Sequence, residues 1–249
     1  MNFNVSVMNK LNPNWIVGFV DGNGYFDVSN DQKTFHFILS QNIKSVNILY
    51  TIKRFFKCGS VSNEIPGTNL REYRVSSKKH LENIIVPFFQ KWPLKTSKKK
   101  SFEIFIKKLN PTLYLESVEN SNFNLHWFIG FVDAKGCFIC SIIRTNIRPQ
   151  FFISLKEVDK NILDQIKQNL NLGIRYKQKN GIEVFQLSSN KNMCYFAKHI
   201  LLTKGYKDRL KTYKRIQARK WCKIVLLMKQ KKHKTIDGFN KIQKLNKSF

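Results

Sequence analysis

Two short segments of the chain, 112 residues apart, carry the residues whose types could do chemistry. The first reads WIVGFVDGNGYF over residues 15–26, and the second reads WFIGFVDAKGCF over residues 127–138. Each segment holds one aspartate, Asp21 or Asp133. Carboxylate oxygens are ligands that Mg²⁺ prefers, and a pair of them could hold an ion that assists hydrolysis. This chemistry depends on the elements that position the two side chains.

The two segments belong to a tandem repeat that extends over most of the chain. Residues 37–52 match residues 151–166, and Gly59 matches Gly173. In each half, the hydrophobic periodicity predicts a helix, two strands, a second helix, two more strands and a third helix. We therefore expect a first repeat over residues 1–110, a linker over 111–124, a second repeat over 125–228 and a basic tail over 229–249.

Small residues recur at a spacing of four in the first helix of each repeat. They are Gly18 and Gly22 in one copy, and Gly130 and Ala134 in the other. Residues four apart lie on the same face of a helix, and small side chains allow two helix backbones to approach closely. We expect the two helices to form the subdomain interface along a pseudo-two-fold axis.

The charge of the chain excludes an ordinary metabolic enzyme as the default and indicates a polyanionic partner. There are 44 Lys and Arg against 16 Asp and Glu, which gives a formal net charge of +28. Residues 204–249 alone hold 16 basic and 2 acidic residues. We expect a long basic helix from about Lys204 to Met228. For the tail beyond it, a disordered basic arm is the simplest interpretation.

The predicted strand over residues 174–179 alternates apolar and basic residues. We expect each sheet to have an apolar face covered by helices and a basic exposed face, and the two exposed faces to form a long positive concavity. Solvated surface is the alternative interpretation of these charges, but their clustering on one face favours contact with phosphate. The candidate nucleic-acid-binding residues are Arg74, Arg144, Arg148, Arg175, Lys177, Lys179, Lys231, Lys232 and Lys234.

The remaining composition bears on the compartment. No apolar run approaches the length of a membrane span, and residues 1–13 resemble neither a signal peptide nor an import presequence. The five cysteines are odd in number and scattered, which favours reduced thiols. Cys137 and Cys140 form a lone CxxC, for which two small apolar residues are a better interpretation than a zinc site. Lys outnumbers Arg 35 to 9 and there are 25 Asn, a bias typical of AT-rich organelle genomes.

The paired segments resemble the two motifs of single-chain LAGLIDADG homing endonucleases and group I intron maturases. The resemblance covers nearly all of residues 10–225, with further matches in the segment ending at Gln41 and in Pro93–Lys98. It implies an α+β fold of tandem αββαββα subdomains with saddle-shaped antiparallel sheets. It also implies that each motif helix ends at an acidic residue, and that the two acids bind the divalent metal with which the family cleaves both strands of DNA.

Neither half retains the acidic residue that the resemblance implies. The matching positions, immediately before the last glycine of each motif, hold Asn23 and Lys135. Asn offers one neutral oxygen, and the ammonium of Lys repels a metal ion. Asp21 and Asp133 lie two residues earlier, about 200° around a helix, so we expect them to have structural roles. Lys135 is either a cation that neutralises phosphate or a solvated residue that drifted in after the acid was lost.

Two further positions match the family's active-site residues. Gln41 matches its water-positioning Gln, but the second repeat has Leu155 at that place, and Lys98 matches its active-site Lys. With the acids lost, we expect Gln41 and Lys98 to be remnants of a dismantled cleavage centre, and we expect no catalytic residue and no metal.

We therefore expect a non-cleaving nucleic-acid-binding protein that acts on structured RNA in preference to DNA. It would be an intron maturase or a structural part of a ribonucleoprotein such as the mitochondrial ribosome, encoded and located in a mitochondrion or other organelle. We expect a monomer with internal pseudo-symmetry, other ribonucleoprotein proteins as further partners, no cofactor and no membrane association. The alternatives are a double-strand DNA endonuclease with divergent Mg²⁺ ligands and an inactive DNA-binding relic.

Overall fold

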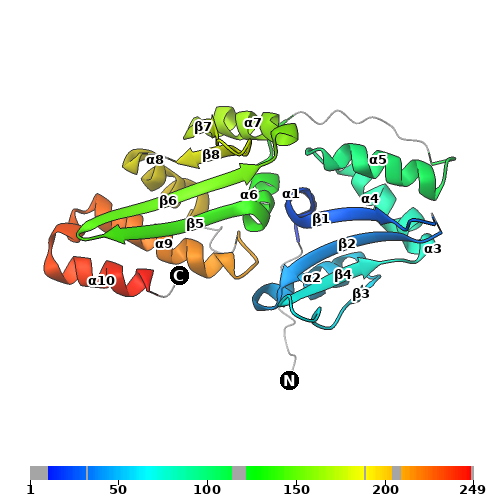
Figure 1. Ribbon diagram of the computed structural model, residues 1–249, viewed down its shortest axis with the longest axis horizontal. Coiled ribbons are helices and arrows are strands. Elements are labelled where there is room, and N and C mark those ends of the chain that lie inside the picture. Colours follow the sequence, from blue (N-terminus) through cyan, green and yellow to red (C-terminus); the bar gives the residue numbers. More distant parts are fainter. Residues whose placement is uncertain (1–10, 32, 114–121, 188, 204–208, 248–249) are drawn as a thin grey trace, which may run out of the picture. The chain divides into compact units, whose positions relative to one another are not determined.

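The structure is a computed structural model that describes residues 11–31, 33–113, 122–187, 189–203 and 209–247 (Figure 1). The chain divides into two compact units, residues 1–134 and 135–249. The division falls inside the first helix of the second repeat, so nearly all of that helix belongs to the first unit. Within the described ranges, no helix is long and apolar enough to cross a membrane.

The first unit has an antiparallel sheet with the strand order β1-β2-β4-β3. The sheet carries its helices on one face, and the helix α6 completes the unit. The elements are α1 (Pro13–Asn23), β1 (Gly24–Val28), β2 (Phe35–Asn42), η1 (Ile43–Ser45), α2 (Val46–Phe56), β3 (Ser60–Val61), β4 (Leu70–Val75), α3 (Lys78–His80), the π-helical η2 (Leu81–Ile85), α4 (Val86–Lys91), α5 (Lys98–Leu109) and α6 (Leu125–Lys135).

The second unit repeats the same antiparallel order, β5-β6-β8-β7. Its elements are β5 (Gly136–Ile143), β6 (Asn146–Leu155), η3 (Glu157–Asp159), α7 (Lys160–Leu170), β7 (Ile174–Lys177), β8 (Glu183–Leu187), α8 (Asn190–Tyr195), the π-helical η4 (Phe196–Leu201), α9 (Lys214–Lys229), η5 (Lys232–Lys234) and α10 (Ile236–Asn246). The predicted α+β fold class and the order of elements in each half are confirmed.

The second helix of each repeat ends in the same way. Lys57 and Asn171 follow α2 and α7 in the left-handed conformation, with φ of 54° and 50°. Two residues later, Gly59 and Gly173 have φ of 75° and 78°, and a Cβ at either glycine would lie within 2.7 Å of a carbonyl oxygen in the adjacent strand. Glycine is required here because the turn needs both a positive φ and this close approach. This explains why the two glycines match in the repeat.

Aromatic side chains fill the core between the first sheet and its helices. Phe26 contacts the rings of Phe37, Phe89, Phe102 and Phe105, with centroids 4.7 to 5.5 Å apart. These rings come from two strands and two helices, so their burial joins the sheet to its helical layer. The corresponding core of the second unit is built around the fully buried Trp221 of α9, and its ring contacts are with Phe138, Phe151 and Phe196.

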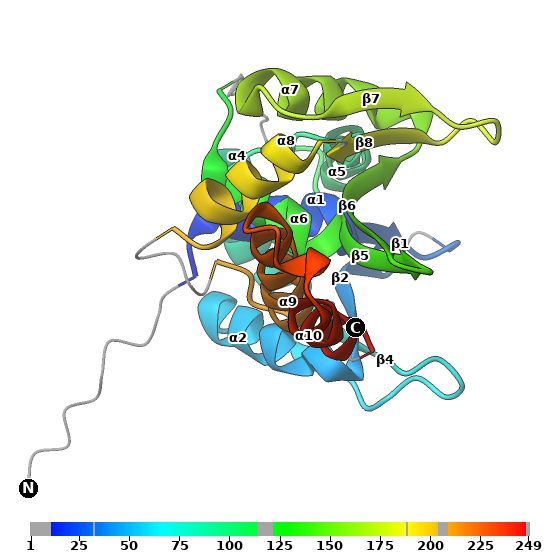
Figure 2. The ribbon, with the colours of Figure 1, turned by 90° about the vertical axis from the view of Figure 1, so that its left-hand side faces the viewer.

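The C-terminal segment departs from two expectations. The basic helix α9 begins at Lys214 rather than near Lys204, which lies outside the described residues. The interpretation of residues 229–249 as a disordered arm is wrong, because η5 and α10 form there and Ile242 is fully buried. Ile242 packs with Ile147, Ile224 and Leu227, so α10 covers an apolar patch at the far end of the β5–β6 hairpin (Figures 1 and 2).

Candidate functional site: the motif helices and the basic surface

The motif helices α1 and α6 touch backbone to backbone within the first unit. A Cβ on Gly18 would lie 1.9 Å from the carbonyl oxygen of Trp127, and a Cβ on Gly130 would lie 2.0 Å from that of Trp15. Any larger side chain at either glycine would force the helices apart. Gly22 is also buried and Ala134 is half-buried. The spacing of small residues thus places the contact of the two helices at Gly18 and Gly130.

Asp21, on α1, accepts hydrogen bonds from two other segments and does not face an open site. It is 3% exposed. Its oxygens accept hydrogen bonds from the backbone amides of Lys95 and Thr96 at 3.0 to 3.2 Å, from Thr96 Oγ1 at 2.7 Å and from Trp127 Nε1 at 2.7 Å. Asp21 therefore ties α1 to α6 and to the turn that precedes α5. The sequence signal was the Pro93–Lys98 match, whose backbone supplies two of these donors.

Two features of its environment have opposite effects on the pKa of Asp21. Burial raises the pKa of the carboxyl, while the hydrogen bonds from Trp127, Thr96 and Lys95 lower it. The ammonium of Lys95 bonds to the carbonyl oxygen of Asn122 at 2.8 Å and lies over the Trp127 ring. All of these partners belong to the first unit. Asp21 therefore stabilises the packing of this unit, in agreement with the structural role expected from its position on the helix.

The remaining motif positions lie at the ends of the two helices. Asn23 is the last residue of α1 and is half-buried, and Lys135 is the last residue of α6 and is exposed. Asp133 is 1% exposed. Lys98 Nζ donates at 3.0 Å to the carbonyl oxygen of Val20, which also accepts a hydrogen bond from the Gly24 amide at the C-terminal end of α1. Lys98 thereby also stabilises the motif helix.

Gln41 lies on the helix-covered side of the first sheet. It pairs with Arg71 of β4, and it is half-buried near the end of β2. Leu155, which holds the matching place in the second repeat, is 8% exposed and belongs to the core. The two matched positions therefore differ in chemistry although both lie near the end of the second strand of their repeat.

The open face of the first sheet, opposite its helices, carries a carboxylate beside its arginine. Arg74 Nη2 lies 3.0 Å from Glu72 Oε2. Glu72 also accepts hydrogen bonds from Tyr25 at 3.0 Å and Ser40 at 2.9 Å. Burial alone would raise the pKa of Glu72, but the bonds from Arg74, Ser40 and Tyr25 outweigh it and lower the pKa. Glu72 is thus ionised at neutral pH and compensates the charge of Arg74.

The expected orientation of the strand over residues 174–179 is wrong. Arg175 bonds to Asp164 of α7 at 2.6 Å and to the buried Glu183 of β8, so it lies on the helix-covered side. Lys177 pairs with Glu157 on the same side. Ile174 and Tyr176 occupy the open face instead and are 46% and 39% exposed. The predicted alternation is present, but the basic side chains face the helices, where they pair with the buried Glu183 and with Asp164 and Glu157.

As a result, the open face of the second sheet is weakly charged. Of the described strand residues on it, only Arg148 carries a charge, and it lies opposite Ser141. The face also exposes the apolar side chains of Ile139 and Ile143. The expectation of a basic exposed face on each sheet is therefore not met in the second unit.

The other candidate basic residues lie in turns and in the C-terminal segment. Arg144, with φ of 56°, is in the turn between β5 and β6, and Lys179 is in the turn between β7 and β8. Lys231, Lys232 and Lys234 flank or form η5, and all three are exposed. These residues present charge to solvent at separate places, and the structure does not bring them together on one strand face.

Comparison with known proteins decides the family. A family model described as LAGLIDADG endonuclease matches residues 16–109 and 128–225, once in each repeat. The chain belongs to the LAGLIDADG endonuclease family. One match lies in each repeat of the sequence, and each begins inside a motif helix and includes its C-terminal part.

Several known proteins resemble this chain along most of its length. An uncharacterized cox1 intron-2 protein of Schizosaccharomyces pombe is 27% identical over 244 residues, which cover 92% of this chain and 70% of that protein. A probable intron-encoded endonuclease 4 of Neurospora crassa is 27% identical over 94% of this chain, but this chain spans only 44% of it. The homing endonuclease I-GzeII, solved with its DNA target, has a TM-score of 0.80 at 23% identity, over 96% of this chain and 98% of that one.

The residues at the LAGLIDADG acid positions do not fit a divalent metal. Asn23 contributes a neutral oxygen, and Lys135 contributes an exposed ammonium. Asp21 already accepts from four donor groups. Among the described residues, no three His, Cys, Asp or Glu side chains are grouped so that they could hold a metal ion. Cys137 and Cys140 of the CxxC lie on opposite faces of β5 because they are three residues apart in a strand.

Proposed function

We propose that this LAGLIDADG protein binds structured RNA and does not cleave nucleic acid. The observation that carries the proposal is the pair of residues at the ends of the motif helices, Asn23 and Lys135. Hydrolysis assisted by Mg²⁺ needs anionic oxygens that compensate the loss of water from the ion. One neutral amide and one cation do not supply them.

The nearest carboxylate on α1 does not replace the lost acid in this proposal. Asp21 is turned into the first unit, where backbone and side-chain donors satisfy both of its oxygens. Moving it to face a metal would leave these buried donors unpaired, at a cost of about 1–3 kcal/mol for each. The architecture of the motif helix is preserved, and its carboxylate serves that architecture.

The distribution of charge supports RNA over duplex DNA held by the sheets. Phosphate contacts supply most of the affinity for a duplex, yet Glu72 offsets Arg74 on one open face and the other carries Arg148 alone among its described strand residues. Basic residues are concentrated instead in the helical C-terminal part of the chain. Structured RNA is recognised through shape, phosphates and unpaired bases, and such contacts do not require a basic sheet face.

The relatives support an organellar role. Several of them have names that describe intron-encoded endonucleases, and one, a Saccharomyces cerevisiae protein, is named as mitochondrial. We propose that this chain is likewise encoded and active in a mitochondrion, as an intron maturase or as a structural component of a ribonucleoprotein.

A DNA endonuclease with divergent metal ligands is the second candidate function. The DNA-bound LAGLIDADG enzymes among the similar structures favour it, since their fold is shared along almost the whole chain. It requires ligands other than Asn23 and Lys135 at the ends of both motif helices.

A cleavage assay separates these two functions. The wild-type chain is incubated with supercoiled and linear duplexes that contain the intron insertion site of its gene, with Mg²⁺ or Mn²⁺. We expect no cleavage. We also expect none from Asn23→Asp alone, because Lys135 still opposes a metal. Nicking at a defined sequence by the wild-type chain would overturn the proposal, and activity from the single variant would refute this account of the site.

Crosslinking identifies the nucleic acid. The protein is crosslinked in a native organelle extract, and the copurifying nucleic acid is sequenced. Recovery of one intron indicates a maturase, and recovery of ribosomal RNA indicates a ribosomal component. Recovery of genomic DNA alone would contradict an RNA role.

A further inference from the structure

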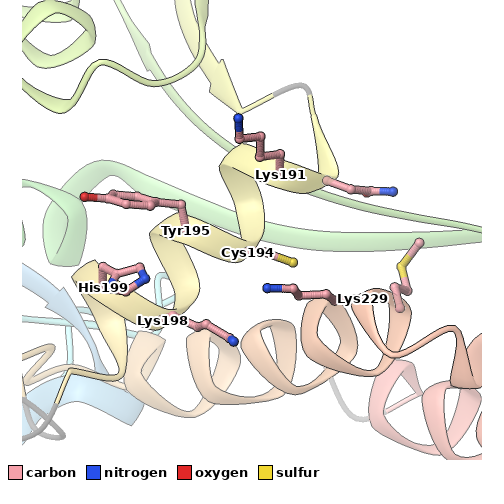
Figure 3. Close-up of a pocket in the computed structure, with 8 residues that line it drawn as sticks. Lys191, Cys194, Tyr195, Lys198, His199 and Lys229 are labelled. Carbon is pink, nitrogen blue, oxygen red and sulfur yellow. The ribbon is translucent and has the colours of Figure 1, made fainter.

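A basic groove lies on the helical side of the second unit, away from the open face of its sheet. It has a volume of about 340 Å³ and lies between the α8–η4 helix and the C-terminal end of α9 (Figure 3). Its lining residues are Asn190, Lys191, Cys194, Tyr195, Lys198, His199, Met228 and Lys229. None of the candidate residues that the sequence suggested lies in it.

Among the described residues, no carboxylate pairs with the lysines of the groove. Lys198 and Lys229 extend from facing helices toward the space beside Cys194 (Figure 3). Burial raises the pKa of the Cys194 thiol, and the charges of Lys229 and Lys198 lower it. Both ammonium groups are therefore close enough to Cys194 to affect its pKa. The ion pairs of the described residues include neither lysine. Between residues 184 and 236 the sequence has 15 Lys and Arg and one acidic residue, Asp208, which lies outside the described residues.

An exposed aromatic pair lies on the same helix as Lys198. Tyr195 is 50% exposed, and its ring lies 4.6 Å from that of His199, with 36° between the planes. Both rings lie on the other side of the α8–η4 helix from Lys198 (Figure 3). Lys191 is four residues before Tyr195 and so shares its face. An aromatic surface beside ammonium groups can stack a base while a neighbouring phosphate is neutralised.

The first repeat shows that the fold does not require this composition. Ser77 caps the corresponding helix as Ser189 caps α8, each accepting from the amide three residues on. Counted from these serines, the first repeat has Glu82, Asn83, Val86 and Pro87 where the second has Cys194, Tyr195, Lys198 and His199. The same helix is therefore built in this chain without the aromatic pair and without a lysine at the position of Lys198, although Lys79 matches Lys191.

We propose that this groove binds an unpaired stretch of RNA, with a phosphate between Lys198 and Lys229 and an adjacent base stacked on the Tyr195–His199 pair. The strand crosses the α8–η4 helix, because the cations and the rings lie on its two sides. This inference deepens the proposed function by placing the RNA contact on the helical side of the second unit.

The test uses the full chain and a fluorescein-labelled oligoribonucleotide of ten uridines. Anisotropy gives the Kd at several salt concentrations for the wild type, for Lys198→Gln/Lys229→Gln, and for the control pair Lys160→Gln/Lys167→Gln, whose lysines are exposed on α7. Each lost phosphate contact should reduce the slope of log K against log salt by about 0.7. We expect a slope smaller by about 0.7 to 1.4 for the groove pair and no change for the control pair. Equal slopes for the two pairs would overturn the proposal.

A second set of variants tests the stacking. Tyr195→Ala should weaken binding about tenfold, and Tyr195→Phe should retain the wild-type Kd, since the ring and not the hydroxyl supports the base. Replacing one uridine with 4-thiouridine and irradiating should give a crosslink that mass spectrometry locates at residues 190–199. A crosslink confined to other segments, or equal Kd values for Tyr195→Ala and the wild type, would refute the site.

These results can be told apart from failure of the proposed function. A wild-type chain that cleaves duplex DNA, with oligoribonucleotide binding that still depends on Lys198 and Lys229, would reject the proposed function and keep the groove. A non-cleaving chain that copurifies with RNA but shows no effect of the groove variants would do the reverse.

Discussion

The structural role of Asp21 gives the sharpest prediction. We consider Asp21→Ala, measured by urea unfolding and tryptophan fluorescence. Three of the four tryptophans, Trp15, Trp92 and Trp127, belong to the first unit, so the signal reports mainly on the unit that contains Asp21.

The magnitude follows from the hydrogen bonds that the variant loses. Three backbone or side-chain N–H donors and one hydroxyl, from Lys95, Thr96 and Trp127, bond to the carboxylate. A buried donor left unpaired costs about 1–3 kcal/mol. Relief of the buried charge offsets part of this total, so we expect the unfolding free energy of the first unit to fall by about 3–5 kcal/mol. Asp21→Asn keeps one acceptor and should cost about half as much.

Asp27→Ala is the matched control, because Asp27 is exposed on β1 of the same unit. It should change the unfolding free energy by no more than about 0.5 kcal/mol. Addition of Mg²⁺ should leave the difference between the wild type and Asp21→Ala unchanged. A loss of unfolding free energy below about 1 kcal/mol for Asp21→Ala would refute the structural role. Stabilisation of the wild type by Mg²⁺ that Asp21→Ala abolishes would also refute it and would indicate that Asp21 binds the metal.

Three further predictions follow from buried groups. Burial raises the pKa of Asp21 above its ordinary 3.8, so the folded state binds a proton at this carboxyl more readily than the unfolded state does. The stability of the wild type relative to Asp21→Asn should therefore fall as the pH rises through the acid range, which denaturant titrations at several pH values measure. Gly18→Ala should lower the unfolding free energy by about 3 kcal/mol or more, since its Cβ meets a carbonyl oxygen at 1.9 Å; wild-type stability would contradict the helix contact. Ile242→Ala should cost about 2–4 kcal/mol while Ile236→Ala, at an 82% exposed position, costs almost nothing, and equal effects in calorimetry would show that α10 does not pack on the second unit.

Much of the fold could be predicted because the sequence contains two copies of the same pattern. Hydrophobic periodicity predicted one set of elements, and the second repeat provided a second copy in which positions required by the backbone are among those that match. Gly59 and Gly173 illustrate this, since both have a positive φ and a close carbonyl neighbour. The C-terminal helix α10 has no counterpart in the first repeat. Its apolar residues, Phe239, Ile242 and Leu245, lie among many lysines, and composition alone concealed them.

The candidate site was less predictable because a charged strand face can lie either toward the helices or toward solvent. Alternation in residues 174–177 fixes which side chains share a face but not which face meets the helices. The direction is decided by Asp164 and Glu183, which pair with Arg175 from a neighbouring helix and a neighbouring strand. The groove residues Lys198 and Lys229 are separated by 31 positions and meet only because α9 returns along the α8–η4 helix. In the sequence, the groove could have been suspected from the comparison of the repeats, which has Tyr195 where the first repeat has Asn83.

The two repeats also explain how a basic protein can have weakly charged sheet faces. Where a sheet binds a duplex, its open face must neutralise phosphates, and a carboxylate that offsets an arginine, or an apolar surface, lowers the affinity. Glu72 offsets Arg74 on one open face, and Ile139, Ile143 and Ile174 lie on the other. The excess of Lys and Arg lies instead in the part of the second repeat and its extension that covers the helical side. In the proposed function the chain does not cleave, so no duplex has to be held at the ends of the motif helices, where Asn23 and Lys135 lie. The basic residues of the helical side agree with the proposal that a different nucleic acid binds at a different surface.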